Sequence, residues 1–165
     1  MAARGWLDLL FLGAAGAIYA TDQVTKAWAT RTLGPGAGPR SIEIVGDWLR
    51  LSYTTNTGAA FGFLPSGSAL FTVIAVVAVP VIWYFNRTMR PRSVLTRLCM
   101  GGLLGGALGN LTDRLRHGYV VDFIDAGVGT LRWPAFNVAD SAFVLGVIAL
   151  SLYMLFLESR HTRAA

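Results

Sequence analysis

The chain has 165 residues and a net charge of +5, and 54% of its residues are hydrophobic whereas only 14% are charged. This composition excludes an ordinary soluble domain of that length and predicts a membrane protein. The basic excess does not require a nucleic-acid partner, because the expected membrane topology, described below, accounts for it.

Four apolar segments predict transmembrane helices, at about residues 6–30, 68–85, 93–112 and 141–157 of a single domain covering 1–165. A hydrocarbon core of about 30 Å takes about 17 to 25 helical residues to cross. The first segment could instead be a cleavable secretory signal, since Arg4 precedes it and "AWA" at residues 27–29 mimics a small-residue cleavage site. Its apolar run is long for a signal peptide, which favours a retained span.

The first segment ends in polar residues. Asp22 and Lys26 are four residues apart, so their side chains can meet on one helix face. Either an ion pair that fixes the helix end or a direct functional role explains them. Polar residues at the edge of an apolar bundle cost free energy to place there and are therefore functional candidates.

Residues 31–67 lie between the first two segments and predict a small surface β-hairpin. "SIEIV" and "WLRLSYT" alternate in period two around Gly46 and Asp47. The loop "NTGAAFGFLPSG", which begins at Asn56, is rich in small residues that allow close backbone approach to a ligand. A plain connecting loop is the alternative.

The third segment, "MGGLLGGALGN", repeats glycine at helical spacing, which predicts close helix contact. It ends in Asn110, Asp113 and Arg114. The single cysteine, Cys99, cannot form an internal disulfide. We expect no metal site, because the two histidines fall on opposite sides of the membrane in the topology below.

The stretch "GYVVDFID" seats Asp122 among apolar residues. In an extended strand Val120, Asp122 and Ile124 share a face, so desolvation should raise the pKa of the Asp122 carboxyl. Asp140 follows Asn137 in "FNVADS", and as an N-cap it would accept backbone N–H bonds that favour its ionised form.

Two carboxylates biased in opposite directions suit acid and base chemistry near neutral pH. We therefore expect Asp122 to carry the proton of the resting pair and Asp140 to be ionised. The open alternative is a capping Asp140 that is unrelated to a loop residue Asp122.

Orientation follows from the arginines, because short loops rich in Lys and Arg stay in the cytoplasm. Seven arginines fall on the side of both termini against only Asp8 and Glu158, whereas basic and acidic residues balance on the other side. Both termini should therefore be cytoplasmic, and the polar clusters should lie near the extracytoplasmic face.

Together these residues resemble one family, the lipoprotein signal peptidases or signal peptidase II, which are aspartyl proteases of the bacterial inner membrane with four spans. The likeness runs in order through "TDQVTKAW", "NTGAAFG", "GGALGNLTDRLRHGYVVDFID" and "FNVADSAFVLG". The implied fold is all-α, with four transmembrane helices and a small extracytoplasmic β-hairpin or cradle.

The resemblance implies that Asp122 and Asp140 are the catalytic dyad, at the aspartates of the family's "VVDF" and "FNxAD" motifs. Asp22 and Lys26 match its first-helix motif in a supporting role. Positions that match its substrate-binding or site-lining residues are Asn56, Gly106, Asn110, Arg114, Asn137 and Ala139. We expect Arg114 to bind Asp113, a backbone carbonyl or the substrate.

The family cuts prolipoproteins before a cysteine that carries a diacylglyceryl group, so the implied partners are such signal peptides and membrane lipid. No cofactor is implied, and a monomer is expected. The rival interpretations are a transporter or proton pathway that uses the outer carboxylates, a serine enzyme using Ser141 or Ser68 with Lys26, and a noncatalytic scaffold.

Overall fold

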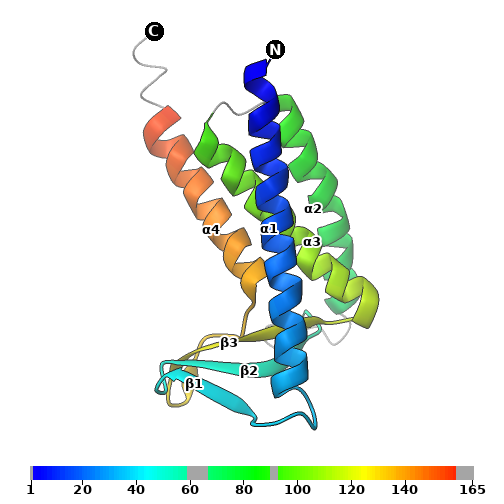
Figure 1. Ribbon diagram of the computed structural model, residues 1–165, viewed down its shortest axis with the longest axis vertical. Coiled ribbons are helices and arrows are strands. Elements are labelled where there is room, and N and C mark those ends of the chain that lie inside the picture. Colours follow the sequence, from blue (N-terminus) through cyan, green and yellow to red (C-terminus); the bar gives the residue numbers. More distant parts are fainter. Residues whose placement is uncertain (1, 59–66, 90–92, 159–165) are drawn as a thin grey trace.

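The computed structural model describes residues 2–58, 67–89 and 93–158. The four long helices are α1 (Ala2–Leu33), α2 (Gly67–Met89), α3 (Val94–His117) and α4 (Val138–Tyr153), and a short π-helical turn, η1 (Met154–Glu158), continues α4. The helices run alongside one another, with the start of α1 and the end of α4 at the same end of the bundle (Figure 1).

Three of these helices are long and apolar enough to cross a membrane: Ser68–Thr88, Val94–His117 and Val138–Phe156. They correspond to the second, third and fourth predicted spans. α1 has 32 residues, but Asp8, Asp22 and Lys26 lower its hydropathy. Among the described residues the structure thus supports three of the four predicted spans, and the first span remains a prediction.

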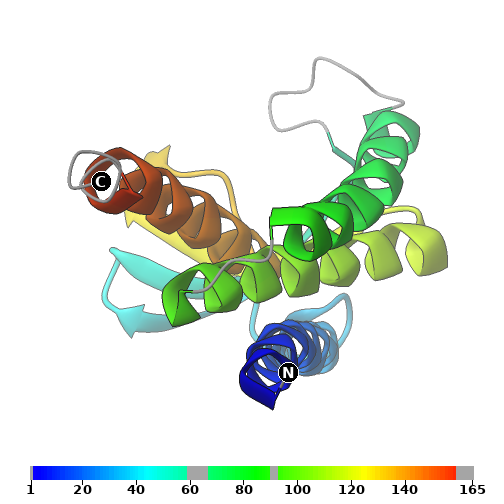
Figure 2. The ribbon, with the colours of Figure 1, turned by 90° about the horizontal axis from the view of Figure 1, so that it is seen from above.

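α3 is the central helix and contacts each of the other three. Figure 2 shows α1 on one side of α3, with α2 and α4 on the other. A Cβ on Gly101 or Gly105 would lie 2.5 Å from a backbone oxygen of α1, and one on Gly106 would lie 2.5 Å from the carbonyl oxygen of Ala139 in α4. The predicted role of these glycines in close helix contact is confirmed.

A four-stranded antiparallel sheet lies across the other end of the bundle, in the order β1 (Ser41–Val45), β2 (Leu49–Asn56), β3 (Val120–Val128) and β4 (Leu131–Arg132) (Figure 1). The predicted hairpin is confirmed as β1 and β2. The predicted combination of a helical bundle with a small β element is confirmed in outline, but the β element is larger than a hairpin, because β3 pairs with β2 and extends the sheet. This pairing sets Thr54 opposite Asp122.

Two backbone features bring the start of α4 next to β3. Gly118 ends α3 in the left-handed conformation, at φ 79°, and its N–H bonds the carbonyl of Arg114 at 3.0 Å, which turns the chain into β3. Past the sheet, the N–H of Ile124 bonds the carbonyl of Phe136 at 2.8 Å. The chain therefore enters α4 directly beside Asp122, three residues before the predicted start of the fourth span.

Candidate active site

Asp122 is only 1% exposed and lies in the buried first half of β3. Its Oδ2 accepts a hydrogen bond from Asn56 Nδ2 at 2.8 Å, and its Oδ1 accepts one from Asn137 Nδ2 at 2.7 Å. β2 thus supplies one partner and the start of α4 supplies the other. The carboxyl is held from both oxygens, as a positioned reacting group requires.

Burial raises the pKa of Asp122 to about 6. The hydrogen bonds from Asn56 and Asn137 oppose this rise, whereas the negative charge of Asp140 adds to it. The predicted direction of the shift is therefore confirmed. A carboxyl that titrates near pH 6 can exchange a proton under physiological conditions.

Asp140 is the third residue of the first turn of α4, and the predicted N-cap position is wrong. The N-cap is Asn137, whose Oδ1 accepts the N–H of Asp140 at 2.9 Å. Asp140 Oδ2 in turn accepts the N–H of Asn137 at 3.2 Å. This reciprocal capping box, formed because Asn137 and Asp140 are three residues apart, fixes Asp140 at the positive end of the helix.

Two asparagines connect the carboxyls of Asp122 and Asp140. Asn137 Nδ2 donates to Asp122 Oδ1 and also lies 3.2 Å from Asn110 Oδ1. Asn110 Nδ2 donates to Asp140 Oδ1 at 2.7 Å. Residues from β3, α3 and α4 therefore meet in one hydrogen-bonded chain, and the alternative of an Asp140 unrelated to Asp122 is wrong.

Asp22 and Lys26 form the predicted ion pair, with Lys26 Nζ 2.8 Å from Asp22 Oδ2. Lys26 Nζ also lies 3.0 Å from Asp113 Oδ2 and donates to Asn110 Oδ1 at 2.9 Å. Both side chains are almost fully buried. The ion pair on α1 is thus part of the network that reaches Asp140.

Asp113 and Gln23 are absent from the site residues that the resemblance implies, although both belong to this network, and Asp113 had been noted only as one of the polar residues that end the third segment. Gln23 Nε2 donates to Asp113 Oδ1 at 3.1 Å. One signal was available in the sequence, because Asp113 follows Asn110 by three residues and so shares its helix face. Gln23 offered no such signal, because its bonds to Gly109 and Asp113 join residues that are 86 and 90 positions away along the chain.

Arg114 lies at the edge of the network. Its Nη1 donates to the carbonyl of Asn110 at 3.4 Å, and its guanidinium lies 5.7 Å from the ring centre of Phe71. The expected backbone contact is confirmed, and pairing with Asp113 is wrong, because Asp113 binds Lys26 instead. Arg114 Nε is buried without a hydrogen-bond partner, which leaves a donor for a ligand.

Gly106 and Ala139 bring α3 and α4 together beneath Asp140. Ala139 is fully buried, and its carbonyl oxygen occupies the space that a Cβ on Gly106 would need. These two predicted site residues therefore contribute by being small. Their close contact lets Asn110, one helical turn beyond Gly106, reach Asp140.

A groove of about 210 Å³ opens beside Asp140 between α2, α3 and α4. Asn110, Arg114 and Asp140 line its polar part, and its apolar lining includes Phe71, Ala78, Phe143 and Val144. An apolar groove with a few convergent polar groups is the usual form of a ligand site. This groove therefore places apolar side chains next to the carboxyl of Asp140.

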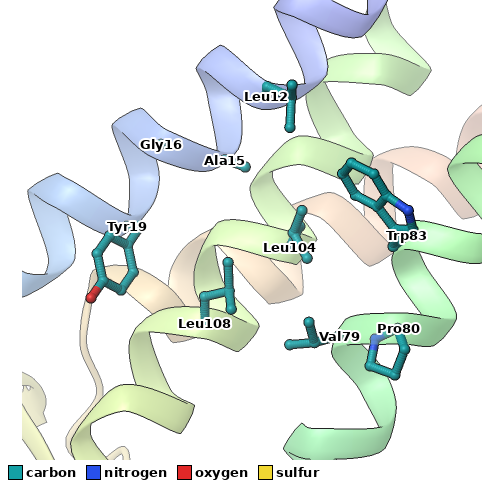
Figure 3. Close-up of a pocket in the computed structure, with 9 residues that line it drawn as sticks. All are labelled: Leu12, Ala15, Gly16, Tyr19, Val79, Pro80, Trp83, Leu104 and Leu108. Carbon is teal, nitrogen blue, oxygen red and sulfur yellow. The ribbon is translucent and has the colours of Figure 1, made fainter.

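A second cavity, of about 570 Å³, lies between α1, α2 and α3. Figure 3 shows its lining of apolar side chains, including Leu12, Tyr19, Val79, Trp83, Leu104 and Leu108. None of its lining residues carries a carboxyl or amide side chain. The larger cavity is therefore not where Asp122 and Asp140 meet.

The described residues contain no group of three or more His, Cys, Asp or Glu side chains placed to hold a metal ion. The polar groups of the site are carboxyls, carboxamides, one lysine and one arginine. The chemistry that this set supports directly is proton transfer between a carboxyl pair and a water.

The model of the signal peptidase (SPase) II family matches residues 14–156, which include every residue of this network. The chain belongs to the signal peptidase II family. The resemblance read from the sequence motifs is thereby confirmed, and the family is one of membrane proteases.

Relatives in the signal peptidase II family cover most of the chain. A lipoprotein signal peptidase of Moorella thermoacetica is 41% identical, over 84% of this chain and 87% of the relative. One from Halothermothrix orenii is 46% identical, over 69% of this chain and 75% of the relative. A bacterial membrane enzyme solved by the in meso method at 1.9 Å superposes with a TM-score of 0.79 at 31% identity, over 89% of this chain and 93% of that one.

Proposed function

We propose that this signal peptidase II family member is a membrane aspartic endopeptidase, that it removes signal peptides from prolipoproteins, and that Asp122 and Asp140 are its catalytic pair. The observation that carries the assignment of the pair is the asparagine bridge. Asn137 and Asn110 hold the two carboxyls in one network at the polar end of an apolar groove.

In this mechanism the two carboxyls share one proton, as like charges at close range cannot both ionise easily. Ionised Asp140 takes a proton from a water whose oxygen attacks the scissile carbonyl carbon. Asp122 gives its proton to the carbonyl oxygen. Return of a proton from Asp140 to the amide nitrogen then breaks the C–N bond and releases the amine. As the carbonyl re-forms, one hydroxyl of the tetrahedral intermediate returns its proton to Asp122, so that both carboxyls regain their starting proton states when the new acid leaves.

The groove between α2, α3 and α4 suits the apolar part of a signal peptide. Its apolar side chains would contact that segment, while Asp140 lies at the polar part where the scissile bond must stand. The unpaired Nε of Arg114 is available for a substrate carbonyl. We infer that the substrate cysteine carries a diacylglyceryl group, whose acyl chains would remain in the surrounding lipid.

Asn56 supports Asp122 from the sheet, and its Oδ1 accepts the N–H of Gly58 at 2.8 Å. The loop that we expect to cover the scissile bond continues through residues 59–66, which lie outside the described residues. The proposed cover is therefore argued from its sequence of small residues alone.

We place the enzyme in the bacterial inner membrane as a monomer, with four spans, cytoplasmic termini and the site near the extracytoplasmic face. The arginine distribution supports this orientation. So does the arrangement of the bundle, since the start of α1 and the end of α4 lie opposite the sheet (Figure 1).

The test is cleavage of a diacylated prolipoprotein by purified protein in detergent. Asp122→Asn and Asp140→Asn should each abolish cleavage, because neither amide can exchange the proton. Ser141→Ala should retain substantial activity, because Ser141 Oγ only bonds the carbonyl of Asn137, at 2.9 Å. Asp125→Asn is the matched control on β3 and should cut at the normal rate.

Normal cleavage by either Asp122→Asn or Asp140→Asn would exclude the aspartic mechanism. Loss of cleavage in Ser141→Ala together with retention in the aspartate variants would favour a serine enzyme.

A further inference from the structure

Two buried carboxylates outside the proposed catalytic pair flank a single lysine. Asp22 is 0% exposed and Asp113 is 3% exposed, and Lys26 Nζ lies 2.8 Å and 3.0 Å from them. Desolvation of buried charges costs free energy that can exceed the gain from their ion pairs, so buried ion pairs are weak evidence of a role in stability. Stability alone is thus a poor explanation for this cluster.

Asp22 uses its second oxygen on the backbone of α4. Its Oδ1 accepts the N–H of Ala139 at 3.0 Å. Ala139 immediately precedes Asp140 in the chain, so this bond fixes the peptide unit from which Asp140 projects.

Asp113 makes the equivalent bond to β3. Its Oδ2 accepts the N–H of Val121 at 3.1 Å, and Val121 immediately precedes Asp122. The same arrangement therefore occurs twice, with one buried carboxylate holding the amide that comes before each proposed catalytic aspartate.

Lys26 joins the two halves. Besides its ion pairs to Asp22 and Asp113, it donates to Asn110, which in turn donates to Asp140. Lys26 and Asp22 are on α1, and Asp113 is on α3. β3 and the start of α4 are therefore both held by the same pair of packed helices, α1 and α3.

We propose that Asp22, Lys26 and Asp113 form a positioning unit, which sets the relative placement of Asp122 and Asp140 through the amides of Val121 and Ala139. Asp113 is thereby a positioning residue for the reaction. This inference rests on the proposed function, since it assumes that the pair of aspartates performs the chemistry. Misplacing a reacting group by about 1 Å can cost about 100-fold in rate.

The test compares two replacements of similar size at Asp113. Asp113→Leu removes the acceptor for the Val121 N–H, and kcat should fall by about 30-fold to 100-fold while KM stays within about twofold. Asp113→Asn keeps an acceptor oxygen, and kcat should stay within about tenfold of the wild-type value.

Asp8→Leu is the matched control for a general loss of stability. Asp8 Oδ1 pairs with Arg97 Nη1 at 2.8 Å, and both residues lie far along α1 and α3 from the site. This variant should lower the thermal midpoint in detergent and leave kcat unchanged.

A wild-type kcat in folded Asp113→Leu, or an equal fall of kcat in Asp113→Asn and Asp113→Leu, would overturn the proposal. So would a kcat loss of the same size in Asp8→Leu. If Asp113→Leu does not fold, hydrogen exchange of the Val121 amide in Asp113→Asn decides instead. The proposal is supported if the Val121 amide of Asp113→Asn stays protected from exchange and the kcat of this variant is within tenfold of the wild-type value. Loss of either property overturns the proposal.

Asp122→Asn assayed alongside separates this inference from the proposed function. Cleavage by Asp122→Asn at the wild-type rate means that the proposed function has failed. An inactive Asp122→Asn beside fully active Asp113 variants means that only the positioning unit has failed.

Discussion

At the scale of single residues, Asp122 combines a buried, apolar setting with two amide donors. The apolar setting was predictable, because the neighbours of Asp122 in "YVVDFI" are apolar and a strand buries alternate positions. The donors were not predictable as partners. Asn56 and Asn137 are 66 and 15 residues away along the chain, and only the tertiary arrangement brings them to one carboxyl.

The raised pKa of Asp122 makes a prediction about stability and pH. The folded state keeps the proton to about pH 6, whereas the unfolded chain releases it near 3.8. This stabilisation of the folded state is complete below about pH 4 and is lost as pH rises through 6, by about 3 kcal/mol. Relative to Asp122→Asn, the wild type should become less stable across that window.

Chemical unfolding in detergent at a series of pH values, for both proteins, measures this difference. Use of the Asn variant as the reference cancels the titration of groups that do not interact with Asp122. A wild type that gains relative stability between pH 4 and 6 would contradict the assigned pKa.

At the scale of elements, the glycines of α3 decide how closely the site residues approach. Their spacing in the sequence predicted close contact, and the structure adds the partner of each. Gly101 and Gly105 face α1, whereas Gly106 faces the start of α4. Sequence spacing identifies a helix face made of small residues, but it cannot say which neighbouring helix packs against that face.

Gly106→Ala should impair both stability and cleavage. Its Cβ would lie 2.5 Å from the carbonyl oxygen of Ala139, so α4 must move away from α3. The expected cost is about 1 to 3 kcal/mol in the free energy of unfolding. Cleavage should fall at least about tenfold, because the displacement carries Asp140 with it.

Gly13→Ala is the matched control, since nothing lies within 4 Å of a Cβ at that helical position. Gly13→Ala should leave cleavage unchanged. Because alanine favours a helix more than glycine does, the free energy of unfolding should stay the same or rise by up to about 1 kcal/mol. Equal behaviour of the two variants would show that backbone contact at Gly106 is unimportant.

At the scale of the whole molecule, the sheet lies at one end of the helices, and the start of α1 and the end of α4 lie at the other (Figure 1). Hydropathy predicted the spans that the structure supports, but it could not reveal that β3 completes a four-stranded sheet. Pairing between β2 and β3 joins segments separated by two helices, and no local pattern encodes that register.

The orientation is testable by thiol labelling in a Cys99→Ala background. Ala37→Cys lies in the segment before β1, and Thr88→Cys lies near the end of α2. In intact cells without an outer membrane, an impermeant reagent should label position 37 and should label position 88 only after permeabilisation. The opposite pattern would reverse the proposed topology.

The network that joins α1, α3, β3 and α4 has a consequence for biosynthesis. Asp22 and Lys26 are made early in synthesis, whereas Asn137 and Asp140 follow them by more than 110 residues. The hydrogen-bonded network around Asp122 and Asp140 therefore cannot be complete until α4 has been made and packs against α3. If the proposed pair is catalytic, the growing chain is inactive until then.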